Sequence, residues 1–214
     1  MTDKPSQVRL ALAKGRVAKV AIKLLEDVGY HFPDYTPKSR KLVFEDSTGA
    51  IAFFLVKSPD VPTYVEKGTA DIGIVGKDVL MEHPARVYEI LNLDIGRCRM
   101  CVAGYPGTTF SYDRKLTVGS KYINIAKQYF DSIDQPADLI EINGSVELAP
   151  VLGLSDVIVD IVETGDTLRE NGLDVLHTIC EISSRLIVNQ VSLKTKNDAI
   201  MPIIEAFEKS QESE

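Results

Sequence analysis

The stretch Asp156-Val-Ile-Val-Asp-Ile-Val-Glu-Thr-Gly-Asp-Thr-Leu168 contains the most informative pattern of the chain. Its first part, Val157–Val162, is an almost unbroken run of β-branched residues, as expected of a strand buried on both faces of a sheet. The run breaks at Gly165, and a short helix is predicted to follow and to end at Gly172. A buried strand that leads through a glycine turn into a helix is typical of an α/β protein.

Strands and helices alternate on both sides of this stretch. A strand is predicted over Val8–Ala13, a break at Lys14-Gly15-Arg16, and an amphipathic helix over 17–28. Further strands are predicted at 41–44, 51–57, 70–75, 87–93, 100–103, 116–118, 139–142, 175–182 and 186–191, and further helices at 62–67, 123–130, 146–152 and 199–207. The pattern restarts near residue 95, which favours two α/β lobes of mainly parallel sheet flanked by helices.

Composition excludes several classes of protein. The 214 residues include 24 Lys and Arg and 31 Asp and Glu, a net charge of −7, with no basic tract longer than the short cluster at 38–41. A general nucleic-acid surface is therefore not expected. No apolar run approaches the ~18 residues of a membrane span, and residues 1–7 lack the apolar region of a signal peptide. Three cysteines cannot all pair, so we expect a reduced, cytoplasmic protein without membrane contact.

The turn after the buried strand is a candidate anion site. Successive backbone N–H groups at such a turn can hold a phosphate, Gly165 permits close approach, and Thr164 and Thr167 add hydroxyl donors. Asp160 and Glu163 flank the turn, where they suit sugar hydroxyls or a magnesium ion. Together these residues predict a phosphoribosyl pocket. An ordinary helix cap at Thr167 beside solvated acids would give the same spacing, and the spacing leaves both interpretations open.

Lys14-Gly15-Arg16 is a second candidate site. Two cations around a glycine, between a strand and a helix, can clamp a diphosphate, although a solvated surface turn has the same tripeptide. Gly76 ends another predicted strand, either to admit a ligand or to form a plain turn. Arg40 and Lys57 have the ordinary appearance of solvated strand residues.

Missing motifs narrow the chemistry further. The sequence contains no P-loop, no G-x-G-x-x-G and no G-x-S-x-G. Cys98 and Cys101 are three residues apart in a predicted strand, which places their thiols on opposite faces and argues against zinc or redox use. The three histidines are scattered. Transfer between two bound small molecules fits these residues better than catalysis by a protein nucleophile.

The motifs also resemble those of a known family. Ala13-Lys-Gly-Arg16, Asp71-Ile-Gly-Ile-Val-Gly76 and the segment from Asn143-Gly-Ser-Val-Glu-Leu-Ala-Pro150 to Leu168 are similar to the ATP phosphoribosyltransferase family over nearly the whole chain. The resemblance implies a two-lobed fold like type II periplasmic binding proteins, with the active site in the interlobe cleft. It assigns residues 1–94 and 178–214 to the first lobe, and 95–177, with the phosphate-binding turn, to the second.

The resemblance implies that N1 of ATP displaces pyrophosphate from C1 of phosphoribosyl pyrophosphate (PRPP), with substrate-bound Mg2+, in the first step of histidine biosynthesis. By analogy, the residues that bind PRPP are Lys14, Gly15, Arg16, Glu147, Asp160, Glu163, Thr164, Gly165, Asp166 and Thr167. Those expected to bind ATP are Arg40, Lys57, Asp71 and Gly76, and those expected to be catalytic are Arg16, Arg40 and Lys57. The metal ligands are not assigned.

The length resembles that of the short form of the family, whose partner is a regulatory subunit similar to histidyl-tRNA synthetase. The resemblance implies a homodimer within a hetero-octamer. Two alternatives remain at the level of sequence. One is a different PRPP-dependent phosphoribosyltransferase, and the other is a non-catalytic solute-binding module of the same fold.

Overall fold

The structure, a computed structural model, describes residues 7–36 and 38–211. The chain divides into two compact units, the first made of Met1–Gly96 and Ser183–Glu214 and the second of Arg97–Ile182. The predicted lobes place the return to the first lobe earlier, after residue 177. In the structure the return comes later, because one strand runs from Asp174 to Ile182 and pairs along that length within the second unit. No helix in the described ranges is long and apolar enough to span a membrane.

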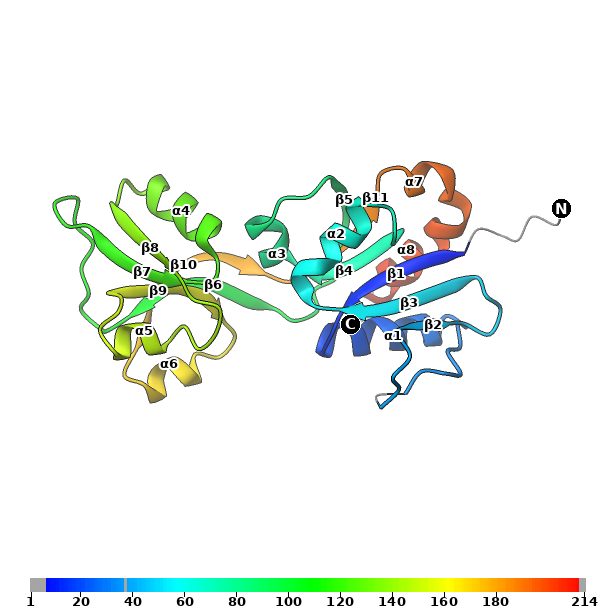
Figure 1. Ribbon diagram of the computed structural model, residues 1–214, viewed down its shortest axis with the longest axis horizontal. Coiled ribbons are helices and arrows are strands. Elements are labelled where there is room, and N and C mark those ends of the chain that lie inside the picture. The colour runs from blue at the N-terminus through cyan, green and yellow to red at the C-terminus, as the bar shows by residue number, and fades with distance from the viewer. Residues whose placement is uncertain (1–6, 37, 212–214) are drawn as a thin grey trace. The chain divides into compact units, whose positions relative to one another are not determined.

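The first unit is a six-stranded sheet between two layers of helices (Figure 1). Its elements are β1 (Val8–Ala13), α1 (Arg16–Asp27), β2 (Val43–Glu45), β3 (Ile51–Val56), η1 (Ser58–Asp60), α2 (Val61–Glu66), β4 (Ile72–Gly76), α3 (Lys77–Glu82), β5 (Val87–Asn92), β11 (Ser184–Asn189), α7 (Ser192–Thr195) and α8 (Asn197–Gln211). The strand order is β2-β3-β1-β4-β11-β5.

Alternating side chains of the central strands build a core on each face of this sheet. Leu10 and Leu12 of β1 face α1 and α8, whose buried stripes include Leu25 and Phe207. Ala11 of β1 faces the other way, toward α2 and α3. Because the residues of a strand alternate between faces and those of a helix repeat every three or four, this register buries the apolar residues of β1 on both faces of the sheet.

The second unit is a five-stranded sheet with helices on both faces. Its elements are β6 (Cys98–Gly104), β7 (Leu116–Ser120), α4 (Ile123–Ser132), β8 (Ala137–Glu141), α5 (Leu148–Val151), β9 (Val157–Val162), α6 (Asp166–Glu170) and β10 (Asp174–Ile182), in the strand order β10-β6-β9-β7-β8. Ile158 and Val162 of β9 pack with Val146, Ala149 and Leu168 around α5 and α6. As predicted, β9 is a buried strand.

Both sheets are mixed, so the expectation of mainly parallel sheets needs correction. Parallel pairing joins β3, β1 and β4 in the first unit and β9, β7 and β8 in the second. The strands that carry the chain between the units, β5, β6, β10 and β11, pair antiparallel with their neighbours. Periodicity predicts each strand but not its direction, because strand direction depends on how distant segments pair.

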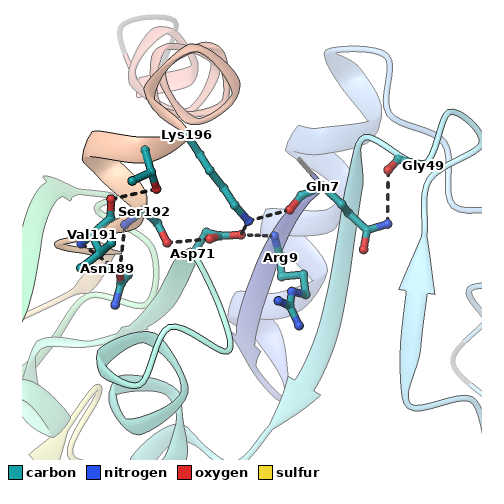
Figure 2. A network of polar contacts seen from close by, with 9 residues as sticks. Gln7, Arg9, Gly49, Asp71, Asn189, Val191, Ser192 and Lys196 are labelled. Atoms are coloured by element: carbon teal, nitrogen blue, oxygen red, sulfur yellow. Dashed lines mark hydrogen bonds and ion pairs between the residues drawn. The ribbon is translucent and has the colours of Figure 1, made fainter. Parts of the chain in front are cut away.

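A buried polar network fastens the C-terminal helices to β1 and β4 (Figure 2). The Asp71 side chain, 4% exposed, accepts hydrogen bonds from the Arg9 backbone N–H at 2.8 Å and from the Ser192 hydroxyl at 2.6 Å. It also pairs with the Lys196 ammonium at 2.9 Å, and the same ammonium donates to the Gln7 carbonyl at 3.0 Å. The network therefore joins segments from opposite ends of the sequence.

We predict that Asp71→Asn lowers the free energy of unfolding by about 2–3 kcal/mol, because it leaves the largely buried Lys196 charge without its partner. Denaturant unfolding followed by circular dichroism measures the change. The matched control is Asp34→Asn, which breaks the exposed pair with Lys41 and should cost less than about 1 kcal/mol. Equal losses for the two variants would contradict the structural role of Asp71.

Candidate functional site

A pocket of about 300 Å³ lies at the carboxyl end of β9 in the second unit. We call it the acidic pocket, because four carboxylates line it. Its polar lining consists of Glu147, Asp160, Glu163, Thr164, Gly165, Asp166 and Thr167. These are all the PRPP-binding residues predicted between 95 and 177, so the fold brings together residues that are separated in the sequence.

The turn in this pocket depends on a left-handed glycine. Gly165 has φ 79° and ψ 8° and precedes the first residue of α6. A side chain there would be strained, and its Cβ would lie 3.1 Å from Nη1 of Arg169. That nitrogen donates to the Thr164 carbonyl at 3.1 Å, and the guanidinium also forms an ion pair with Asp166. Arg169, which the sequence reasoning missed, thus closes the turn.

The hydrogen bonds within the turn separate the roles of its two threonines. The Thr164 hydroxyl donates to Asp166 at 2.6 Å. This bond and the Arg169 guanidinium lower the pKa of the Asp166 carboxyl below its usual value, so Asp166 is ionised at neutral pH. Thr167 is exposed and lines the pocket from the first turn of α6. Because the Thr164 proton already has an acceptor, Thr167 is the better placed hydroxyl donor for a ligand.

The remaining carboxylates lie on different elements. Asp160 is half-buried near the end of β9, and one of its oxygens accepts the Ile161 N–H at 2.8 Å. Glu147 is half-buried and directly precedes α5, whereas Glu163 is exposed. Within the described ranges, no group of three or more His, Cys, Asp or Glu side chains could hold a metal ion. The carboxylates can accept hydrogen bonds from the hydroxyls of a sugar.

Two of the predicted cations of the first unit, Lys14 and Lys57, lie at the carboxyl ends of neighbouring strands. The parallel register pairs Ala13 with Val56, so Lys14 and Lys57 each directly follow the carboxyl end of one of two adjacent strands. The Lys14 N–H donates to the Val56 carbonyl at 2.9 Å, which holds the two strand ends together. Gly15 follows with φ 113°, and Arg16 starts α1. The carboxyl edge of parallel strands is the usual position of ligand sites in α/β proteins.

A second pocket, of about 500 Å³, lies in the first unit. We call it the basic pocket: its lining includes Lys14, Lys19, Arg40 and Lys41, together with the ring of Tyr35. Sequence reasoning pointed to Lys14 from its tripeptide and to Arg40 only by resemblance, and it missed the other three. Two sequence signals could have predicted these cations. One is the position of Lys19 in α1, one turn after Gly15, and the other is the basic cluster at 38–41.

Two predicted ATP ligands have other roles. The carboxylate of Asp71 is buried at the start of β4 and bonded to Arg9, Ser192 and Lys196, which gives this residue a structural role. Gly76 lies at the carboxyl end of β4, but the Asp78 carboxylate occupies the space beside it, 2.1 Å from where a Cβ would be. That space is therefore taken by a side chain of the protein itself.

Comparisons with known proteins agree on one family. The family model described as "HisG: ATP phosphoribosyltransferase" matches residues 57–209. ATP phosphoribosyltransferase of Brachyspira hyodysenteriae is 52% identical over 202 residues, 94% of this chain and 98% of the relative. The Oceanobacillus iheyensis protein of the same name is 53% identical over 92% of this chain and 95% of the relative. The solved "ATP phosphoribosyl transferase (HisG:HisZ) complex from Thermotoga maritima" matches with a TM-score of 0.85 and 34% identity, over 97% of this chain and 100% of that chain.

We predict that Thr164→Val raises the pKa of Asp166 toward 3.8, its ordinary value, and that Arg169→Met raises it less, because the Thr164 bond is the stronger cause. The lowered pKa means that these contacts stabilise the fold above about pH 4 and lose that effect as the pH falls through the folded-state value. Carboxyl NMR titration gives the midpoints. The control is Lys127→Met, which breaks another exposed ion pair of the second unit and should leave the pKa of Asp166 unchanged. An unchanged Asp166 pKa in Thr164→Val and Arg169→Met as well would refute the role of Thr164 and Arg169 in lowering it.

Proposed function

The chain belongs to the ATP phosphoribosyltransferase family, and we propose that its acidic pocket holds the phosphoribosyl end of PRPP while cations of its first unit hold pyrophosphate and ATP. The enzyme joins N1 of ATP to C1 of PRPP and releases pyrophosphate, the first step of histidine biosynthesis. What supports the assignment of residues most directly is the convergence of Glu147, Asp160 and residues 163–167 on one pocket.

In this proposal the 5′-phosphate of PRPP binds at the turn around Gly165. The first amide groups of α6 have no carbonyl within the helix to bond, and the Thr167 hydroxyl lies beside them. The negative charge of Asp166 would oppose a phosphate, but its pairing with Arg169 offsets that charge. Asp160 and Glu147 then accept hydrogen bonds from the ribose hydroxyls.

The basic residues of the first unit suit the more highly charged parts of the substrates. Lys14, Arg16 and Lys57 stand at the carboxyl edge of the sheet, where they hold the pyrophosphate group. In the basic pocket, Arg40, Lys19 and Lys41 hold the triphosphate of ATP, and the Tyr35 ring offers a face for its adenine.

Charge stabilisation is the main catalytic contribution of these residues. As the bond from C1 to the pyrophosphate oxygen breaks, positive charge grows on the ribose and negative charge on the leaving group. In the proposal, the carboxylate of Asp160 stabilises the first charge, and Arg16 and Lys57 stabilise the second, so both developing charges meet groups of opposite sign. The adenine N1 is already nucleophilic at neutral pH, so alignment of the substrates matters more than a strong base.

Magnesium enters this scheme as part of the substrate. Mg2+ binds phosphates together with one or two carboxylates and several waters, and Asp160 and Glu163 are the carboxylates next to the turn that could complete such a shell. When bound, the ion neutralises pyrophosphate charge. The protein residues position the sugar and the leaving group around it.

We infer a regulatory partner from the solved relative, which is a HisG:HisZ complex. The chain would then be the catalytic subunit of the short form, paired with a subunit similar to histidyl-tRNA synthetase, as homodimers within a hetero-octamer. The relatives are matched over nearly their whole length, which supports the short form. A cytoplasmic location is the corresponding proposal for a biosynthetic enzyme of this kind.

The test is to mix the purified chain with ATP, PRPP and Mg2+, with and without the HisZ-like subunit, and to follow the N1-phosphoribosyl nucleotide by mass spectrometry. We expect product and pyrophosphate in equal amounts with ATP, and none when adenine or GTP replaces it. Product with another acceptor would identify a different phosphoribosyltransferase. Binding of PRPP without pyrophosphate release would indicate a solute-binding module.

We predict that Thr167→Ala weakens PRPP binding about tenfold, because it removes a hydroxyl donor to a charged phosphate, a hydrogen bond worth roughly 1.5 kcal/mol. Isothermal titration calorimetry gives the Kd, and Thr167→Ser should restore it. Thr63→Ala is the matched control, an exposed threonine in the first turn of another short helix. A Kd that stays at the wild-type value in Thr167→Ala would exclude the hydroxyl from the phosphate site.

A further inference from the structure

Residues 93–96 lead the chain out of the first unit, and we call them the outgoing segment. Backbone hydrogen bonds hold this segment in place. The Leu93 N–H donates to the Ser184 carbonyl at 2.9 Å, and the Ser184 N–H donates to the Ile95 carbonyl at 3.0 Å. Gly96 follows with φ 69°, the left-handed region that favours glycine. The outgoing segment is thus hydrogen-bonded to the start of β11, where the chain returns.

The guanidinium of Arg16 lies against the open side of Gly96. A Cβ built on Gly96 would be 3.6 Å from Nη2 of Arg16 and 4.0 Å from the Ser184 hydroxyl. A single methyl group would therefore touch the guanidinium at ordinary van der Waals distance. Any longer side chain pointing the same way would have to share the space that the guanidinium now occupies.

We propose that Gly96 is a positioning residue for Arg16: by lacking a side chain, it leaves the place where the guanidinium rests. This inference depends on the proposed function, which assigns Arg16 to the leaving pyrophosphate. A charged group stabilises a transition state only from the right place, and a misplacement of about 1 Å can cost on the order of a hundredfold in rate. The outgoing segment then forms part of the support for a catalytic cation.

Two substitutions separate this steric role from the conformational demand of a positive φ. Asn tolerates the left-handed region better than Ala does, but it adds three heavy atoms beyond Cβ. We expect Gly96→Asn to unfold at a higher denaturant concentration than Gly96→Ala. We also expect Gly96→Asn to lower kcat at least tenfold, whereas Gly96→Ala should lower it about threefold. The more stable variant would then be the less active one. If the positive φ were the only demand on Gly96, the more stable variant would also be the more active one.

Gly49 provides the matched control. It has φ 73° and lies in the turn between β2 and β3, and nothing lies within 4 Å of a Cβ built on it. Gly49→Asn and Gly49→Ala should show the same order of stability with kcat within about twofold of wild type. A similar loss of kcat in the Gly49 variants would refute the steric role of Gly96.

A double-mutant cycle links the effect to Arg16. Arg16→Ala is expected to lower turnover at least tenfold, and adding Gly96→Asn to it should lower kcat by less than about twofold more. Multiplying losses would mean that Gly96 acts independently of Arg16, and wild-type kcat in Gly96→Asn would mean that the guanidinium has room; either overturns the proposal. If Arg16→Ala keeps wild-type turnover while the native chain makes product, the proposal for Gly96 and the assignment of Arg16 to the pyrophosphate both fail, and only the activity of the chain as an ATP phosphoribosyltransferase stands.

Discussion

Each candidate site depends on a glycine with positive φ in the turn between a strand and a helix. Gly15 follows β1 with φ 113°, and Gly165 follows β9 with φ 79°. Such backbone lets a buried strand turn at once into a helix, so that polar side chains at the turn stay at the carboxyl edge of the sheet. These turns present Lys14, Arg16 and Thr167 at the strand ends.

The two pockets differ in charge, and the difference fits the binding roles proposed for them. Carboxylates line the acidic pocket, where Arg169 is paired with Asp166. Cations line the basic pocket. A ribose carries hydroxyls and becomes positive during transfer, whereas the triphosphate and the leaving pyrophosphate carry most of the negative charge. Under the proposed function, the charges that line the two pockets are therefore opposite to those of the substrate groups assigned to them.

The first unit is assembled from both ends of the chain, and polar contacts secure that assembly. Asp71 binds Lys196 and Ser192 on one side and the backbone of β1 on the other. At the opposite end of β4, Ser184 holds the outgoing segment that leads to Gly96. Asp71 thus fixes the start of β1, and the bond from the Lys14 N–H to the Val56 carbonyl fixes its carboxyl end, which suits a site that acts by fixed charges rather than by a protein nucleophile.

Most elements and the turn at 163–167 could be predicted from the amino-acid sequence, because β-branched runs, helical periodicity and glycine act over a few residues. The sequence also pointed to Lys14 and Arg16, since they flank a glycine between a strand and a helix. The fold was needed to show that Asp71 is buried among contacts to distant segments, that Lys19 and Tyr35 line a pocket with Arg40, and that Gly96 lies against the guanidinium of Arg16. Those facts depend on pairing between segments far apart in the chain, and local patterns carry no information about which distant group a side chain will meet.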